Sequence, residues 1–137
     1  MTKRWRSVMK ILAAIAAIAV LCSGIYLEIQ SRAAARREAS YQAALRSYQE
    51  IFPPGTTRVA IESKLRLSGT QFHGICCDSG RYADEIQIGR EPAPWYCSFN
   101  HVYLSLQFNA HADLSSDPEP GDVLISATVI RRLEDCL

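Results

Sequence analysis

Residues 101–110 read HVYLSLQFNA, and this stretch decides the fold. Two classes of side chain alternate along it, the apolar Val102, Leu104, Leu106 and Phe108 and the more polar Tyr103, Ser105, Gln107 and Asn109. Successive side chains of a β-strand point to opposite faces of the sheet. The alternation therefore predicts a strand with one buried face and one face in water.

Shorter strands are predicted on both sides of this one. Residues 71–77, 85–88 and 95–98 precede it and are separated by turn-forming residues. Residues 123–130 follow it after an acidic loop that contains proline, and their apolar face consists of Val123, Ile125, Ala127 and Val129. Short strands joined by short turns predict an antiparallel meander.

A helix is predicted over residues 31–50, which are rich in Ala, Arg, Glu and Gln and contain no Gly or Pro. An apolar stripe runs along it at spacings of 4, 3 and 4 residues, through Tyr41, Leu45, Tyr48 and Phe52. In one interpretation the stripe packs on the domain's own sheet. In the other it forms a short dimer seam.

A second helix is predicted after Pro53-Pro54-Gly55, which breaks the first one. Thr56 or Thr57 is expected to cap it by accepting a hydrogen bond from a free backbone N–H. Ile61 and Leu65 give it an apolar face, and Gly69 can take the left-handed conformation that ends a helix.

The N-terminal residues predict a membrane anchor. Lys3, Arg4, Arg6 and Lys10 precede residues 11–27, which carry no charge. As a helix these 17 residues span about 25 Å, near the lower limit for crossing a bilayer. The basic flank favours a cytoplasmic N-terminus with the bulk of the chain outside. We therefore expect a single-pass protein of a bacterial inner membrane.

Two alternatives to a permanent anchor stay open. A signal peptide cut after Ala33-Ala34-Ala35 would release the protein to the periplasm. A lipid on Cys22 would also hold the chain, although Ala19-Val20-Leu21 lacks the small residue expected just before such a cysteine.

Together these segments predict an α+β fold with two parts. Residues 1–30 form the membrane anchor or signal peptide, and residues 31–137 form a disulfide-bonded extracytoplasmic domain. In that domain two helices pack on a three- to four-stranded antiparallel sheet.

Charge is distributed unevenly along the chain. The net charge is +4 over residues 1–35, +3 over 36–70 and −6 over 71–137. A basic stretch beside the membrane followed by an acidic domain suits a protein standing on an anionic surface. The acidic domain argues against nucleic acid as a partner, because phosphate binding needs clustered Lys and Arg.

Four cysteines, Cys76, Cys77, Cys97 and Cys136, lie beyond the apolar run and predict two disulfides in an oxidising compartment. A bond between Cys76 and Cys77 is not expected, since neighbouring side chains on a strand point to opposite faces. We expect one of that pair to bond Cys97 and the other Cys136. The sequence alone does not choose between the three possible pairings.

No catalytic motif stands out, and we expect no cofactor and no metal. A zinc site is one possibility, with His73, Cys76, Cys77 and His101 as ligands. Two adjacent cysteines, however, are poorly placed to coordinate the same ion. His73, Cys76 and Asp78 are close in sequence and suggest a thiol nucleophile, but disulfide bonds explain the cysteines better. The loop with Asp113, Asp117, Glu119 and Asp122 is either a solvated loop or an acid–base pair for hydrolysis, and its spacing fits no EF-hand.

Aromatic residues are the best candidates for partner contacts. Tyr82, Trp95, Tyr96 and Tyr103 are expected around the sheet, where exposed aromatics often mark a binding site. In the other interpretation Trp95 packs against a disulfide of Cys97. The predicted contact surface comprises Trp95, Tyr103, Asp113, Asp117 and Glu119.

The pattern Gly55-x-Thr57-x-x-x-Ile61-x-x-x-Leu65 resembles a helix start in the small outer-membrane-assembly lipoproteins of the SmpA/OmlA type, shared by β-lactamase-inhibitor-like domains. The order of two helices and an antiparallel sheet is also similar. The family usually continues with L-G-x-P, whereas this chain has Leu65-Arg66-Leu67-Ser68. The resemblance covers about a dozen residues and implies a binding or scaffolding module without catalysis.

These observations predict a membrane-anchored periplasmic module that binds another envelope or secreted protein. An alternative is an immunity or inhibitor protein against a toxin or hydrolase, steered by its acidic surface. Another is a small hydrolase that uses the carboxylates of residues 113–122, which would require a pocket holding two of them.

Overall fold

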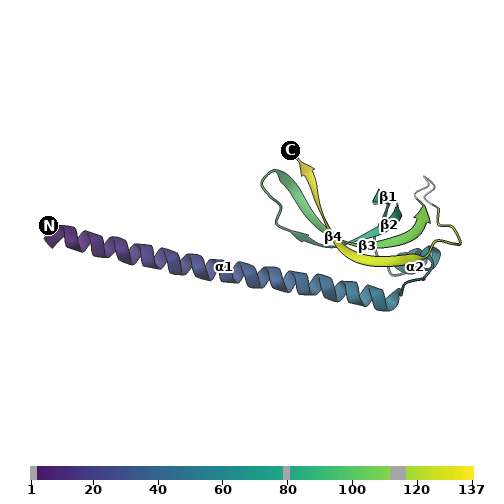
Figure 1. The fold of residues 1–137 in the computed structure, drawn as a ribbon, viewed down its shortest axis with the longest axis horizontal. Coiled ribbons are helices and arrows are strands. Elements are labelled where there is room, and N and C mark those ends of the chain that lie inside the picture. Colours follow the sequence, from purple (N-terminus) through teal and green to yellow (C-terminus); the bar gives the residue numbers. More distant parts are fainter. Residues whose placement is uncertain (1–2, 79–80, 112–116) are drawn as a thin grey trace. The chain divides into compact units, whose positions relative to one another are not determined.

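The computed structural model describes residues 3–78, 81–111 and 117–137 and divides into two units, with the boundary between Ala39 and Ser40. Figure 1 shows the element order, which is α1 (Lys3–Ile51), α2 (Arg58–Leu67), β1 (His73–Asp78), β2 (Arg81–Glu91), β3 (Cys97–His111) and β4 (Leu124–Cys136). The predicted α+β class is therefore confirmed, with α1 continuing from the first unit into the second.

The first unit consists of the N-terminal part of α1. From Val8 onward this helix is long and apolar enough to cross a membrane, and none of its most apolar stretch is buried. Large apolar side chains between Ile11 and Leu27 are exposed, as a lipid-facing helix requires. The run ends where Glu28 and Arg32 pair at 2.8 Å one turn apart.

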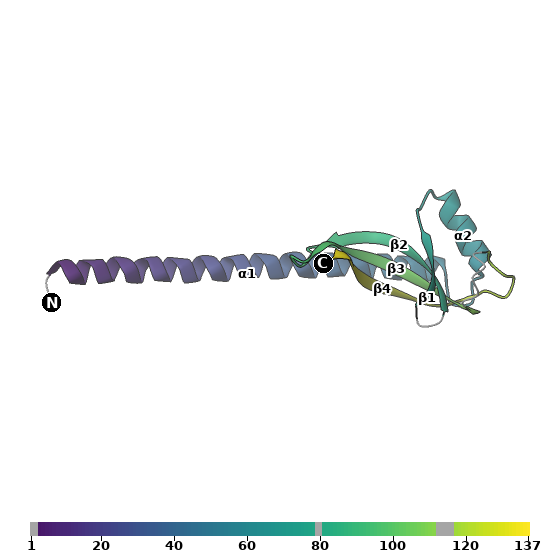
Figure 2. The same cartoon turned by 90° about the horizontal axis from the view of Figure 1, so that it is seen from above.

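The second unit contains a four-stranded sheet in the order β1-β2-β3-β4, with every neighbouring pair antiparallel. This is the predicted meander, and Figure 2 shows the strands lying side by side. Leu104 lies opposite Ile86 on one side and Val129 on the other. The segments predicted separately over 95–98 and 101–110 form one strand, β3.

One face of the sheet is covered by α2 and by residues of α1 in the second unit. The core cluster consists of Phe52, Ile61, Leu65, Ile86, Leu104, Leu106, Phe108 and Leu124. Leu45 and Tyr48 pack against it, and Tyr41 is buried as well. The apolar stripe of α1 therefore packs on the domain's own sheet, as the first interpretation predicts.

The start of β4 differs from the prediction. A register shift between Gln107 and Phe108 brings Leu124 opposite Phe108 and into the core. Val123 and Ile125, predicted to face inward, are only half-buried. An irregularity of one residue reverses which side chains face the core, because side chains alternate with a period of two.

The start of α2 also differs from the prediction. Thr57 is the N-cap residue, but its side chain makes no capping hydrogen bond, and the Thr56 hydroxyl donates elsewhere. The backbone N–H of Arg58 instead donates to the carbonyl of Asp122 at 2.8 Å. The cap is thus supplied by the segment before β4. At the other end Gly69 has φ +70°, the predicted left-handed conformation.

Candidate binding surface

The sheet has a second face that points away from the core, which we call the open face. Its residues alternate along each strand with those that face the core. The polar and aromatic ones among them include His73, Glu85, Gln87, Phe99, His101, Tyr103, Arg132 and Glu134. These side chains come from all four strands, and they are polar or aromatic. The open face is therefore the place where the fold gathers chemistry that the core does not use.

An ion pair crosses the open face from β4 to β2. The Arg132 guanidinium donates two hydrogen bonds to the Glu85 carboxylate, at 3.1 and 2.5 Å, and the Glu85 side chain is fully buried. His73 Nε2 lies 3.6 Å from the same carboxylate. A bidentate pair of this kind fixes the positions of both side chains.

A second polar group lies beside this pair. The Tyr103 hydroxyl donates to Glu134 Oε1 at 2.8 Å, and His101 Nδ1 lies 3.0 Å from Glu134 Oε2. Burial, assisted by the hydrogen bond to Glu134, raises the pKa of Tyr103 to about 12. The hydrogen bond from Tyr103 in turn lowers the pKa of Glu134. The pair therefore stays a neutral phenol donating to a carboxylate near neutral pH.

An aromatic row runs through the same surface along Phe99, His101, Tyr103 and His73. Phe99 stacks on His101 with ring centroids 5.3 Å apart, and His101 meets Tyr103 edge-on at 6.0 Å. Tyr103 then meets His73 edge-on at 5.3 Å. The Arg90 guanidinium lies 4.3 Å from the Phe99 ring centre. The row is thus held in place along its length.

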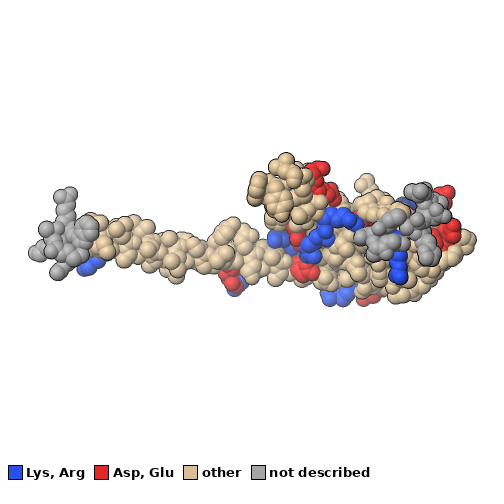
Figure 3. Space-filling view, turned by 45° about the horizontal axis from the view of Figure 1, so that its top comes forward, with Lys and Arg blue, Asp and Glu red and all other residues tan. Residues whose placement is uncertain are grey.

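A shallow cavity of about 340 Å³ lies at the His73 end of this row, lined by Gln71, Phe72, His73, Gln87 and Tyr103. This volume is at the small end for ligand sites, where it suits one side chain or a short peptide segment. Two amide side chains line it and can pair with backbone groups of a bound chain. Figure 3 shows basic and acidic side chains close together on the face it views.

The predicted contact residues that the structure describes lie on different parts of the domain and do not form one surface. Tyr103 is on the open face, but only 7 % of it is exposed, so the expectation of a water-facing ring is wrong. Its hydroxyl and ring edges are covered by Glu134, His101 and His73. Trp95 is 90 % exposed in the β2–β3 connection.

The acidic loop does not form an acid–base pair among the residues described. Asp117 and Glu119 are exposed, and Asp113 lies outside the described residues. The two cavities defined by residues 71, 72, 73, 87 and 103 and by residues 49, 52, 54 and 124–127 have no carboxylate in their walls.

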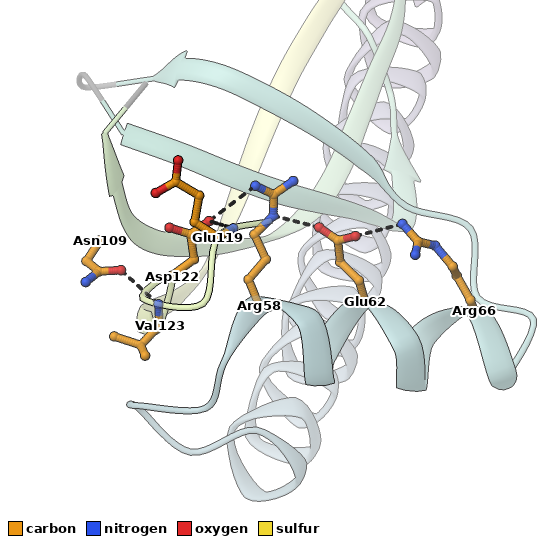
Figure 4. Close-up of polar contacts among 7 residues, drawn as sticks. All are labelled: Arg58, Glu62, Arg66, Asn109, Glu119, Asp122 and Val123. Carbon is orange, nitrogen blue, oxygen red and sulfur yellow. Dashed lines mark hydrogen bonds and ion pairs between the residues drawn. The ribbon is translucent and has the colours of Figure 1, made fainter. Parts of the chain in front are cut away.

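Asp122, expected in a solvated loop, is buried and bound to α2 (Figure 4). The Arg58 guanidinium donates to Glu62 Oε1 at 2.6 Å and lies 3.6 Å from Asp122 Oδ2. Arg66 donates to the other oxygen of Glu62 at 2.7 Å. The backbone N–H of Glu119 donates to Asp122 at 3.0 Å. This network joins α2 to the segment before β4 and so has a structural role.

Asp84 lies fully buried near this network on the core side of β2. The Tyr82 hydroxyl approaches its carboxyl without completing a hydrogen bond of good geometry. Burial, followed by the charge of Glu62, raises the pKa of Asp84 to about 7. A buried carboxyl with such a pKa can be a functional group, but this one is sealed from solvent, which argues for a structural origin of the shift.

The disulfide pairing corrects the prediction. Cys97 is bonded to Cys136, so neither of them reaches Cys76 or Cys77. The two partners lie directly opposite each other on β3 and β4. Cys76 is itself disulfide-bonded, and the side chains of Cys77 and Asp78 lie outside the described part of the chain. Within the described residues, no group of three His, Cys, Asp or Glu is arranged to hold a metal ion.

Comparison with known proteins finds no matching family model, no similar curated protein and no similar solved structure.

Proposed function

We propose that this chain is a membrane-anchored module that binds another protein on the open face of its sheet, without catalysis of its own. Residues 11–27 hold it in a bacterial inner membrane, and the disulfide-bonded domain stands in the periplasm. The Cys97–Cys136 bond supports an oxidising compartment, because disulfides persist there and are rare in the cytosol.

The observation that carries the proposal is the aromatic row on a face that neither α1 nor α2 covers in the part of the chain that the structure describes. Phe99, His101 and Tyr103 are already held in fixed positions by ring contacts and by Glu134, so little conformational entropy is lost when a partner binds. Aromatic anchors surrounded by satisfied polar groups are typical of the central residues of protein interfaces.

The charges of the open face define the partner's chemistry. Arg132 and Glu85 neutralise each other, and Glu134 is engaged by Tyr103. The surface therefore offers hydrogen-bonding groups and the partly exposed rings of His73, Phe99 and His101, rather than an excess of charge of one sign. It suits a polypeptide segment with an apolar side chain for the cavity and backbone groups for Gln71 and Gln87. The resemblance to small outer-membrane-assembly lipoproteins supports the same class.

A photo-crosslinking amino acid at Gln87, on the open face, tests the proposal in the full chain in its native membranes. The matched control places the same amino acid at Ser63, an exposed position on α2. We expect a discrete protein adduct from Gln87 and none from Ser63. His73→Ala, which removes one end of the aromatic row, should weaken the Gln87 adduct by about tenfold, the effect of losing one hot-spot contact.

Two results would contradict the proposal. Equal adducts from Gln87 and Ser63 would show that the open face has no preference for the partner. An unchanged Gln87 adduct in the His73→Ala variant, with the fold intact by circular dichroism, would exclude the aromatic row from the contact.

A further inference from the structure

The connection between β2 and β3 and the end of β4 form an apolar projection, which we call the tip (residues 92–97 and 136–137). None of these residues carries a charged side chain. Trp95 is 90 % exposed, Tyr96 is 43 % exposed, and Leu137 is completely exposed. Figure 3 shows a projecting part of the domain that is mostly uncharged, with acidic atoms along one side. Large aromatic and aliphatic side chains left together in water mark a contact site.

The tip is held rigidly. The Cys97–Cys136 disulfide joins its two segments, and the Leu137 N–H donates to the Tyr96 carbonyl at 2.9 Å. The Trp95 and Tyr96 rings meet edge-on with centroids 5.8 Å apart. The exposed rings therefore belong to a fixed surface, which contacts a partner with little loss of conformational freedom.

The tip lies at a defined end of the domain. Strand β2 ends at Glu91, immediately before the tip, and two residues earlier Gly89 packs against Tyr41 of α1. A Cβ atom at Gly89 would lie 2.5 Å from Tyr41 Cε1. Tyr41 is the second residue of the domain unit, which begins at Ser40. The tip is thus at the end of the sheet where the chain enters the domain from the anchor.

We propose that the tip contacts the lipid headgroup region of the bilayer that holds residues 11–27. This inference rests on the membrane anchoring in the proposed function. Residues 28–39 connect the apolar run to the domain and span about 18 Å as a helix. Such a short connection keeps the membrane surface at a high effective concentration around the domain. Trp and Tyr are the residues enriched at membrane–water interfaces.

Charges beside the tip limit how deeply it enters. Arg131 donates two hydrogen bonds to Glu91, at 3.1 and 3.2 Å. The two opposite charges cancel, so this pair adds no net charge beside the tip. Asp135, next to Cys136, is exposed. A carboxylate there is costly to bury in hydrocarbon and stays in the headgroup layer. The contact is interfacial, with Trp95 as its deepest aromatic side chain.

Tryptophan fluorescence of the full chain in vesicles tests the proposal. The chain has two tryptophans, so Trp5→Phe leaves Trp95 as the only reporter. The variant is reconstituted in phosphatidylethanolamine–phosphatidylglycerol vesicles with lipids brominated near the headgroup end of the acyl chain. We expect the Trp95 emission to fall by about half, as for an indole at the membrane interface.

The matched control moves the reporter to another exposed apolar position. Leu67→Trp, in a chain that also carries Trp5→Phe and Trp95→Phe, places tryptophan on α2, where Leu67 is 89 % exposed. Its emission should remain unquenched. Equal quenching at both positions would overturn the proposal, because it would show general adhesion of the domain.

Vesicle flotation measures whether the anchor holds the chain in the vesicle, independently of whether the tip contacts lipid. Protein that floats with the vesicles while Trp95 stays unquenched keeps its anchor and overturns the lipid contact alone. A blue-shifted, unquenched Trp95 whose emission depends on protein concentration would assign the tip to a protein contact instead. Protein that fails to float would overturn the anchoring and the lipid contact together.

Discussion

Arg132 on β4 reaches across β3 and holds both carboxylate oxygens of Glu85 on β2. The Glu85 side chain is fully buried, whereas the Arg132 side chain is 35 % exposed. The pair ties together three strands on the face that carries the aromatic row. Because a buried carboxylate without its partner is costly, this contact allows a direct stability test of the open face.

Replacing Arg132 by Met should destabilise the domain by about 2–4 kcal/mol, because the buried carboxyl group of Glu85 loses its main partner. Denaturant unfolding of the full chain in detergent measures the change. Glu85→Gln in the same chain should restore part of the loss, since the unpaired charge is then removed. An Arg132→Met variant as stable as the parent would show that the pair is not maintained in solution.

Asp84 should make the stability of the domain depend on pH. Burial raises its pKa from 3.8 to about 7, so the folded state keeps a proton that the unfolded state has lost. The contribution of this group to stability is therefore complete below pH 4 and is lost as the pH rises through 7. Asp84→Asn should be more stable than the parent at pH 8 by about 2–4 kcal/mol, with little difference at pH 4.

The difference between Asp84→Asn and the parent is the useful quantity, because all other titrating groups are common to both chains. Unfolding free energies at several pH values between 4 and 8 give this difference. A constant difference over that range would mean that Asp84 is already ionised in the folded protein at low pH.

Gly89→Ala tests the contact between α1 and the sheet. The new methyl group would lie 2.5 Å from Tyr41 Cε1 and 2.7 Å from the Tyr41 hydroxyl, so the ring must move. We expect a loss of about 1–3 kcal/mol, typical of overpacking. In a Tyr41→Ala background the same substitution should cost much less, because nothing remains to clash with it. Equal costs in both backgrounds would exclude this contact.

Removing the Cys97–Cys136 bond should destabilise the domain. The bond closes a loop with a sequence separation of 39, and its loss by Cys97→Ser with Cys136→Ser costs up to about 4 kcal/mol in the chain-entropy model. Differential scanning calorimetry of the parent and the double variant measures it. Identical melting temperatures would show that the bond does not constrain the unfolded chain.

The main strand and its partners were predictable from their alternation. Leu104 and Leu106 face the core as the pattern of residues 101–110 predicts, and Leu104 lies opposite Val129. Continuing that pairing by seven residues along each strand places Cys97 opposite Cys136, but the register itself is known only from the structure. The sequence analysis predicts a different pairing, because it assigns Cys97 and Cys136 to the adjacent pair Cys76 and Cys77 and ends the last strand at residue 130.

The buried charges could not be predicted from local sequence. Arg58, Glu62 and Arg66 recur every four residues on α2, which is equally typical of an exposed ion-paired face. The β-bridge between Thr57 and Val123 places Asp122 beside Arg58. This tertiary contact buries the ion pairs of α2, and the local sequence does not reveal it. Alternation along the strand predicts that Tyr103 faces water, but alternation alone does not show that Glu134 and His73 cover its side chain.

In the proposed function, one chain joins an uncleaved membrane anchor to a domain that is oxidised outside the cytoplasm. Non-reducing peptide mapping of the protein from native membranes tests both parts together. We predict that peptides from residues 1–35 are recovered in the membrane fraction and that Cys97 and Cys136 are recovered as a linked pair. A chain that begins at Arg36 would rule out the uncleaved anchor, and free thiols at Cys97 and Cys136 would rule out the oxidised domain.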